Sequence, residues 1–147
     1  MFLHANLVHL LYNLYALFLF GNILEDNTNS RVAFVTMMLG GIVGNIGFRL
    51  FSSSPALGFS GSVYALIGAV TLLMPNLKIP LPIGFIAIPV PVKFAGPLMA
   101  LGELALSIAS SDNIAHTAHL SGFLVGLLII KIYNSLSSER VPQLGKH

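Results

Sequence analysis

The stretch FSGSVYALIGAVTLLM, residues 59–74, contains no charged residue and is followed at once by Pro75. Its polar side chains gather at the beginning, and the remainder is almost wholly aliphatic. A run this long and this apolar is typical of a helix inside a lipid bilayer, where each backbone polar group must be hydrogen-bonded within the helix. We therefore predict a membrane helix over residues 59–74.

The composition of the whole chain supports a membrane environment. Hydrophobic residues make up 55% of the 147 residues and charged residues only 8%, whereas a soluble domain has about 25% charged residues. The mean hydropathy is +0.86. These values exclude an ordinary water-soluble domain and a disordered chain, and seven basic residues are too sparse for a nucleic-acid footprint. The absence of cysteine excludes a thiol nucleophile and a cysteine-ligated metal.

Four more apolar runs are bounded by turn-forming or polar residues, which predicts an all-α polytopic membrane helix bundle. Between residues 75 and 93 lie five of the eight prolines, so we expect an interfacial or hairpin-like connection there instead of a helix. We assign residues 1–134 to the transmembrane domain and residues 135–147 to a polar cytoplasmic tail. The five predicted transmembrane helices cover residues 5–24, 32–51, 59–74, 94–110 and 114–133.

Basic residues predict the orientation of this multi-pass protein. Five spans place the two termini on opposite sides, and the positive-inside rule makes the side with more basic residues cytoplasmic. The N-terminal end and the loop at 52–58 then lie on the outer side with Arg49, and the C-terminus is cytoplasmic. The cytoplasmic side receives Arg31, Lys78, Lys93, Lys131, Arg140 and Lys146.

A few uncharged polar residues within the spans indicate a functional site, because such residues are costly in lipid. His9 and Asn13 share one helix face, Ser60 opens the third helix, and His119 lies about 8 Å into the fifth. All four fall in a similar layer near the outer surface. They supply what acyl transfer requires: a hydroxyl nucleophile, an imidazole base and donors to an oxyanion, including the Ser60 backbone N–H.

Small residues would let the third and fifth helices approach closely. Gly61 and Ala65 are spaced i,i+4 on the third helix, and Gly122 and Gly126 have the same spacing on the fifth. Such faces allow backbones to come into contact in membranes. We expect this packing to bring Ser60 within reach of His119.

These residues resemble three motifs of the rhomboid family of intramembrane serine proteases. His4-x-x-x-x-His9-x-x-x-Asn13, followed by Gly21-x-x-x-Glu25, is similar to the family's second membrane helix. Gly58-x-Ser60-Gly61-x-x-Tyr64 is similar to the start of its fourth, and Ala118-His119-x-x-Gly122-x-x-x-Gly126 to its sixth. The match covers nearly the whole chain. The sequence begins where the family's second span begins, so that the first span and the long outer loop with its Trp-Arg pair have no counterpart.

The resemblance implies a serine endopeptidase with a Ser-His dyad and no third carboxylate. Ser60 would attack the scissile carbonyl, and His119 would take the serine proton and later pass it to the leaving amine. His9, Asn13 and the Ser60 N–H would hold the oxyanion, supported by Gly58, and Tyr64 would stack against His119. The implied substrates are single-span membrane proteins, cleaved within the lipid bilayer near the outer face, with no metal or other cofactor and no nucleic-acid partner.

Several other readings of these residues stay open. Glu103 is expected to face the bundle interior and be hydrogen-bonded, with a substrate or proton role as the alternative. His116 and His119, with His4 and His9, make a zinc site conceivable, and Asp112 is expected to cap the fifth helix. The alternative functions are a catalytically silent rhomboid-like protein that binds membrane helices and a small transporter that uses the histidines as a relay.

Overall fold

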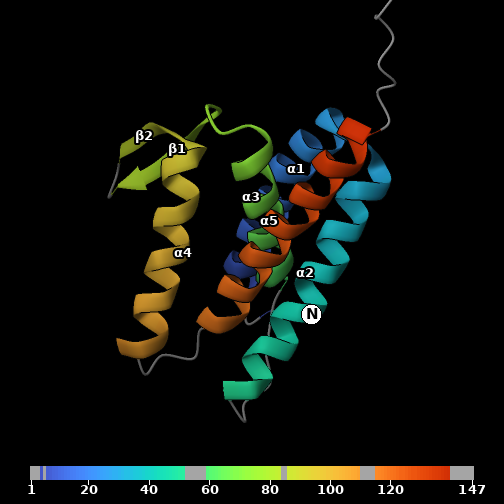
Figure 1. Cartoon of the computed structure of the whole chain (residues 1–147). Coiled ribbons are helices and arrows are strands. Elements are labelled where there is room, and N and C mark those ends of the chain that lie inside the picture. The colour runs from blue at the N-terminus through green and yellow to red at the C-terminus, as the bar shows by residue number, and fades with distance from the viewer. Residues whose placement is uncertain (1–3, 5, 52–58, 84–85, 110–114, 140–147) are drawn as a thin grey trace, which may run out of the picture.

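The computed structural model describes residue 4 and residues 6–51, 59–83, 86–109 and 115–139 (Figure 1). Within these ranges the chain forms five helices and one two-stranded hairpin. Their order is α1 (Leu7–Asn27), α2 (Ser30–Phe51), α3 (Ser60–Leu73), β1 (Lys78–Ile83), β2 (Ile86–Pro91), α4 (Val92–Ala109) and α5 (His116–Glu139).

The predicted all-α membrane bundle is confirmed, and one of its five helices is distinctly shorter than the others. α1, α2, α4 and α5 are each long and apolar enough to cross a membrane. α3 has only 14 residues, a length of about 21 Å at the α-helical rise, against a hydrocarbon thickness of about 30 Å. Its first residue therefore starts below one surface of the bilayer if its other end reaches the opposite one.

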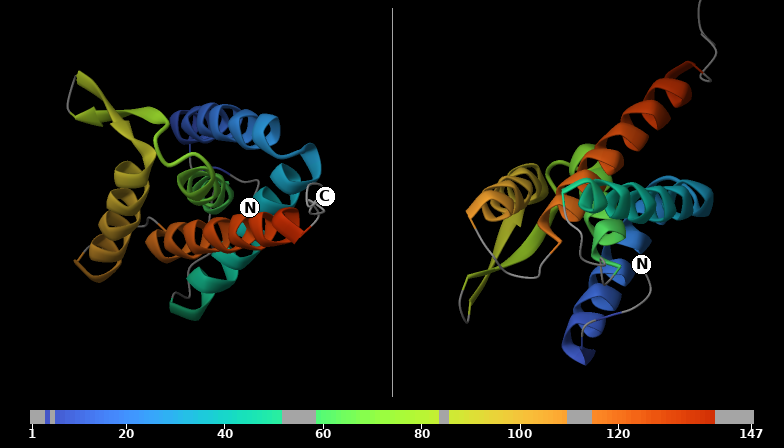
Figure 2. Two further views of the ribbon diagram at one scale, coloured as in Figure 1. Left: turned by 45° about the horizontal axis from the view of Figure 1, so that its top comes forward. Right: turned by 90° about the horizontal axis from the view of Figure 1, so that it is seen from below.

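α3 forms the centre of the bundle. It packs against α1, α2, α4 and α5, and Figure 2 shows it enclosed by these four helices. Every residue from Ala65 to Thr71 is buried. A helix without a polar face fits this position because no side of it meets water. Packing on all sides also holds α3 in place, and with it the side chains of its first turn.

The proline-rich segment, predicted to be an interfacial or hairpin-like connection, forms a β-hairpin. β1 and β2 pair antiparallel, with Lys78 opposite Pro91 and Pro80 opposite Pro89. The open end of the hairpin is tied to the neighbouring backbone, because the Val92 N–H donates to the Leu77 carbonyl at 2.8 Å and the Lys93 N–H donates to the Pro75 carbonyl at 3.0 Å. The hairpin therefore leads directly into α4.

The helix bounds differ from the predicted ones mainly at the polar ends. α1 continues to Asn27 and α5 to Glu139, so the segment predicted as a tail begins inside a helix. A helix satisfies its own backbone hydrogen bonds and needs no apolar side chains to continue beyond the bilayer. Residues 140–147 of the predicted tail, and the predicted cap Asp112, lie outside the described residues.

Large apolar side chains cover much of the outer surface of the bundle. A soluble monomer rarely exposes such extended apolar area, and lipid chains would cover it in a membrane. The chain is an integral multi-pass membrane protein. Examples of these exposed side chains are Tyr12, Phe18, Phe34, Leu50, Phe94, Leu101 and Leu128.

Candidate active site

Ser60 and His119 meet where α3 and α5 begin, although they are 59 residues apart in the sequence. Nε2 of His119 lies 2.7 Å from Oγ of Ser60, a hydrogen-bond distance. Ser60 is the first residue of α3, so its backbone N–H has no acceptor within the helix. The pair therefore combines a hydroxyl, an imidazole in contact with it and a backbone donor beside it, as predicted from the sequence.

Glycines bring the two helices close enough for this contact. A Cβ atom at Gly122 would overlap the carbonyl oxygen of Gly61, and one at Gly126 would overlap that of Ala65. The site of a Cβ on Gly61 is 3.5 Å from the carbonyl oxygen of Ala118. Because Gly61 and Ala118 adjoin the two predicted catalytic residues, this backbone contact sets the register that places Ser60 opposite His119.

A third glycine face, on α2, was not anticipated from the sequence. A Cβ at Gly40 would overlap Cβ of Ala65, and one at Gly44 would lie 2.9 Å from the carbonyl oxygen of Ala118. One turn further on, a Cβ at Gly47 would overlap the Ser121 hydroxyl. The signal is present as Gly40-Gly41-x-x-Gly44-x-x-Gly47, so α2 packs on both α3 and α5.

The Tyr64 ring stacks on the imidazole of His119. The ring centroids are 4.5 Å apart and the planes are inclined by only 5°. Tyr64 lies one turn after Ser60 on α3, so the same helix presents the hydroxyl and the ring that flanks the imidazole. This is the position that the family resemblance implies for Tyr64.

A carboxylate from α4 lies beside the imidazole nitrogen that does not contact Ser60. Oε2 of Glu103 is 3.0 Å from Nδ1 of His119, although this nitrogen makes no hydrogen bond with the described residues. Nδ1 of His116 lies 2.5 Å from the same oxygen, and the Tyr64 hydroxyl donates to Oε1. Glu103 is thus hydrogen-bonded in the interior, as expected, but no sequence pattern connects it with His119.

His9 and Asn13 lie on α1, which packs against α3. His9 is close enough to His119 for an electrostatic interaction, and its ring meets that of His4 edge to face at 5.3 Å. Asn13 is buried and uses one amide N–H to donate to the His9 carbonyl at 3.0 Å. Since a carboxamide has two N–H groups, the contacts among the described residues leave one donor of Asn13 for another acceptor. Gly58, also predicted to support the site, lies outside the described residues.

Glu103, His116 and His119 are also arranged as a set of ligands that could hold a cation. One ligand atom from each of Glu103, His116 and His119 lies within 4.8 Å of the others. The sequence had grouped His116 and His119 with His4 and His9, whereas in the structure the third ligand of the set is Glu103. Imidazole and carboxylate are ordinary zinc ligands. A cation there would, however, take the His119 nitrogen that faces Glu103.

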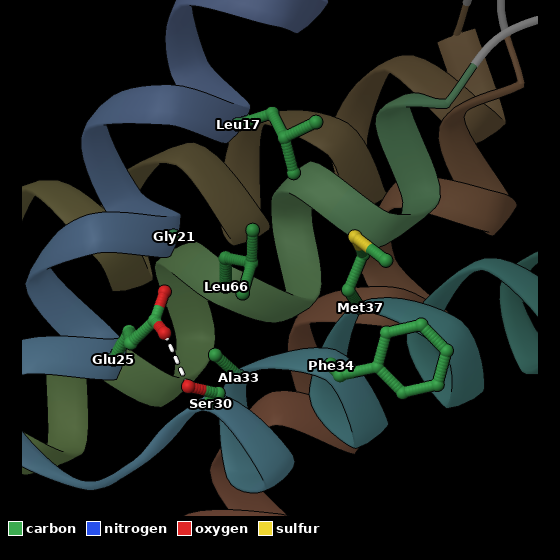
Figure 3. A pocket seen from close by; sticks show the side chains of 8 residues that line it. All are labelled: Leu17, Gly21, Glu25, Ser30, Ala33, Phe34, Met37 and Leu66. Carbon is green, nitrogen blue, oxygen red and sulfur yellow. Dashed lines mark hydrogen bonds between the residues drawn. The ribbon is translucent and has the colours of Figure 1, made fainter.

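A separate cavity of about 310 Å³ lies between α1 and α2, away from Ser60 (Figure 3). At its edge the Ser30 hydroxyl donates to the Glu25 carboxylate across the turn that joins these helices. Leu66 forms its floor from α3. The cavity contains none of the predicted site residues, and its lining is Leu17, Gly21, Glu25, Ser30, Ala33, Phe34, Met37 and Leu66.

A serine in contact with a buried histidine within a polytopic helix bundle is a feature of intramembrane serine proteases. The model of the rhomboid domain matches residues 1–135 of this chain, and the chain belongs to the rhomboid family.

The chain is similar to curated proteins named rhomboid protease GlpG. It is 34% identical over 145 residues to those of Yersinia pestis strain Pestoides F and Yersinia pseudotuberculosis serotype O:3 strain YPIII, an alignment that covers 97% of this chain and 49% of each relative. It is 35% identical over 130 residues to that of Photorhabdus laumondii, with 86% and 43% of the two chains covered. The chain spans about half the length of the curated relatives it matches.

Proposed function

We propose that this protein is an intramembrane serine endopeptidase that cleaves transmembrane helices with Ser60 as nucleophile and His119 as general base. The single observation that carries the proposal is the 2.7 Å contact between Ser60 Oγ and His119 Nε2. Geometry of this kind activates a hydroxyl that would otherwise be a weak nucleophile. Membership in the rhomboid family supports the same reaction class.

In the first step, Ser60 Oγ bonds to the scissile carbonyl carbon while its proton passes to His119 Nε2. The carbonyl π electrons move onto the oxygen, which the Ser60 N–H, His9 and the remaining Asn13 donor would stabilise. Collapse of this intermediate breaks the C–N bond, and His119 gives its proton to the leaving amine. Water then hydrolyses the acyl-enzyme with His119 acting again as base.

We further propose that the site faces the outer side of the membrane and takes single-span membrane proteins as substrates. Figure 1 shows the ends of α2 and α4 and the start of α5 at one end of the bundle, and the hairpin at the other. Lys78 and Lys93 belong to the hairpin end, whereas Arg49 is in the last turn of α2. The positive-inside rule makes the hairpin end cytoplasmic. The short α3 would leave Ser60 recessed below the outer surface.

The two alternative functions are less well supported by the described contacts. A catalytically silent helix-binding protein has no need of a Ser60 hydroxyl bonded to His119. A transporter requires a polar path across the bilayer, whereas the residues of α3 that follow Tyr64, from Ala65 to Val70, are apolar or glycine and are buried.

Labelling with a fluorophosphonate probe tests the nucleophile directly. The folded protein in detergent micelles should become labelled on the peptide that contains Ser60, as read by mass spectrometry, because the probe reacts with activated serines and releases fluoride. The Ser60→Ala variant should lose the label. A label on any other residue would contradict the assignment, and folded wild-type protein that takes no label would favour the silent alternative.

A further inference from the structure

We propose that Glu103 is a positioning residue for His119, which extends the Ser60–His119 pair to a Ser-His-Glu arrangement. The inference rests on the proposed protease function and concerns a residue that the family resemblance does not assign to the site. Its role would be to hold the imidazole in the tautomer that accepts the serine proton and to stabilise the positive charge that the ring then acquires.

The two nitrogens of His119 face different partners. Nε2 is 2.7 Å from Ser60 Oγ, and Nδ1 is 3.0 Å from Glu103 Oε2. A neutral imidazole carries only one N–H, so a ring whose Nε2 accepts from Ser60 must carry its hydrogen on Nδ1, the nitrogen beside the carboxylate. Contacts of this kind are often poorly aligned without substrate and tighten in the reacting complex.

The Glu103 carboxylate is held in place by two further donors. The Tyr64 hydroxyl donates to Oε1, and His116 Nδ1 lies 2.5 Å from Oε2. The side chain is only 11% exposed. Because each oxygen has a protein partner, the carboxylate cannot rotate freely away from His119, and its negative charge stays next to the ring.

Tyr64 contacts both the His119 imidazole and the Glu103 carboxylate that orients it. Its ring lies parallel to that of His119 at a centroid distance of 4.5 Å, and its hydroxyl donates to the Glu103 carboxylate that lies beside Nδ1 of the same imidazole. One residue of α3 therefore fixes both the plane of the ring and the position of the charge beside it. A carboxylate that only tied α4 to the bundle would not need to lie against Nδ1.

Such a carboxylate contributes to the chemical step more than to substrate binding. When the Ser60 proton moves to Nε2 as the Oγ–C bond forms, the ring becomes an imidazolium cation next to the Glu103 anion. When the C–N bond breaks, the proton passes from Nε2 to the leaving amine and the ring is neutral again. Glu103 keeps its charge throughout, so its removal should lower kcat with little effect on KM.

The test compares Glu103→Gln, which keeps the shape and removes the charge, with Glu103→Asp, which keeps the charge. Using a single-span reporter in detergent micelles, we expect Glu103→Gln to lower kcat on the order of a hundredfold or more, at unchanged KM. Glu103→Asp should recover part of that loss. The matched control is Glu25→Gln, which removes the carboxylate bonded to Ser30 in the distant α1–α2 turn and should keep wild-type kcat.

A Glu103→Gln protein that cleaves within about threefold of the wild-type rate would overturn the inference, as would equal losses in Glu103→Gln and Glu103→Asp. If Glu103→Gln does not fold, the Tyr64→Phe variant tests the inference instead, because it keeps the stacked ring and removes the hydroxyl that holds the carboxylate. A several-fold lower kcat for Tyr64→Phe would support the inference. A wild-type kcat would overturn it. Ser60→Ala run in parallel separates the two proposals, since cleavage by that variant would contradict the protease assignment itself.

Discussion

Cleavage of a single-span reporter should fall by a factor of about ten thousand or more when either Ser60 or His119 is replaced by alanine. The physical reason is the direct hydrogen bond between the two side chains, because a serine without its base and a base without its serine are equally unable to begin the reaction. The Ser60→Ala/His119→Ala double variant should be no slower than either single variant. Initial rates in proteoliposomes measure all three.

Ser62→Ala is the matched control for this prediction. Ser62 lies two residues further along α3, is completely buried, and its hydroxyl has no hydrogen-bond partner among the described residues. Removing an unsatisfied buried hydroxyl costs little, so this variant should cleave at close to the wild-type rate. Substantial cleavage by Ser60→Ala, or equal losses in the Ser60 and Ser62 variants, would refute the assignment of the nucleophile.

Gly126→Ala should destabilise the bundle strongly for a single added methyl group. The new Cβ would overlap the Ala65 carbonyl and come within 2.8 Å of both the Ala65 carbonyl carbon and the Ala69 nitrogen. Backbone atoms cannot rotate away as a side chain can, so α3 and α5 must separate, at a cost of about 3 kcal/mol in the free energy of unfolding. Thermal unfolding in detergent measures the loss, and cleavage should fall with it because Ser60 and His119 sit on the separating helices.

Gly102→Ala provides the comparison, because it adds the same methyl group in α4 where no heavy atom lies within 4 Å of the new Cβ. Its melting temperature should be unchanged or slightly higher, since alanine favours the helix over glycine by about 1 kcal/mol. Equal melting temperatures for the two variants would show that the α3–α5 contact is not as close as described.

The pattern of the chain was sufficient to predict most of the fold. The apolar runs locate the helices, and five prolines between residues 75 and 93 predict an interfacial or hairpin-like connection instead of a helix. The end of α5 was predicted six residues too early because the run becomes polar near Asn134, and polarity marks where a helix leaves the bilayer and not where its hydrogen bonding stops. The glycine face of α2 was not predicted, because the spacing of glycines does not show which helix they pack against.

The pairing of Ser60 with His119 was predicted because three local patterns agreed in depth and in small-residue spacing. The contact between Glu103 and His119 was not predicted from the sequence. A carboxylate in an apolar span indicates that some partner must satisfy it, but the partner is set by how α4 is rotated and by how far it leans toward α3 and α5. Neither quantity is encoded in the local pattern of residues 92–109.

The amino-acid sequence alone was therefore sufficient to predict that this chain is a membrane protein, where its helices lie, and that the Ser60 hydroxyl and the His119 imidazole lie at a similar depth. These properties depend on composition, on periodicity and on rise per residue. Tertiary structure alone decided that Glu103 and His116 lie beside the imidazole on which Tyr64 stacks, and that α2 completes the glycine contacts. Those relations depend on how the helices cross and how each is rotated about its axis. Both are set by all the packing contacts of the bundle together and not by any one segment.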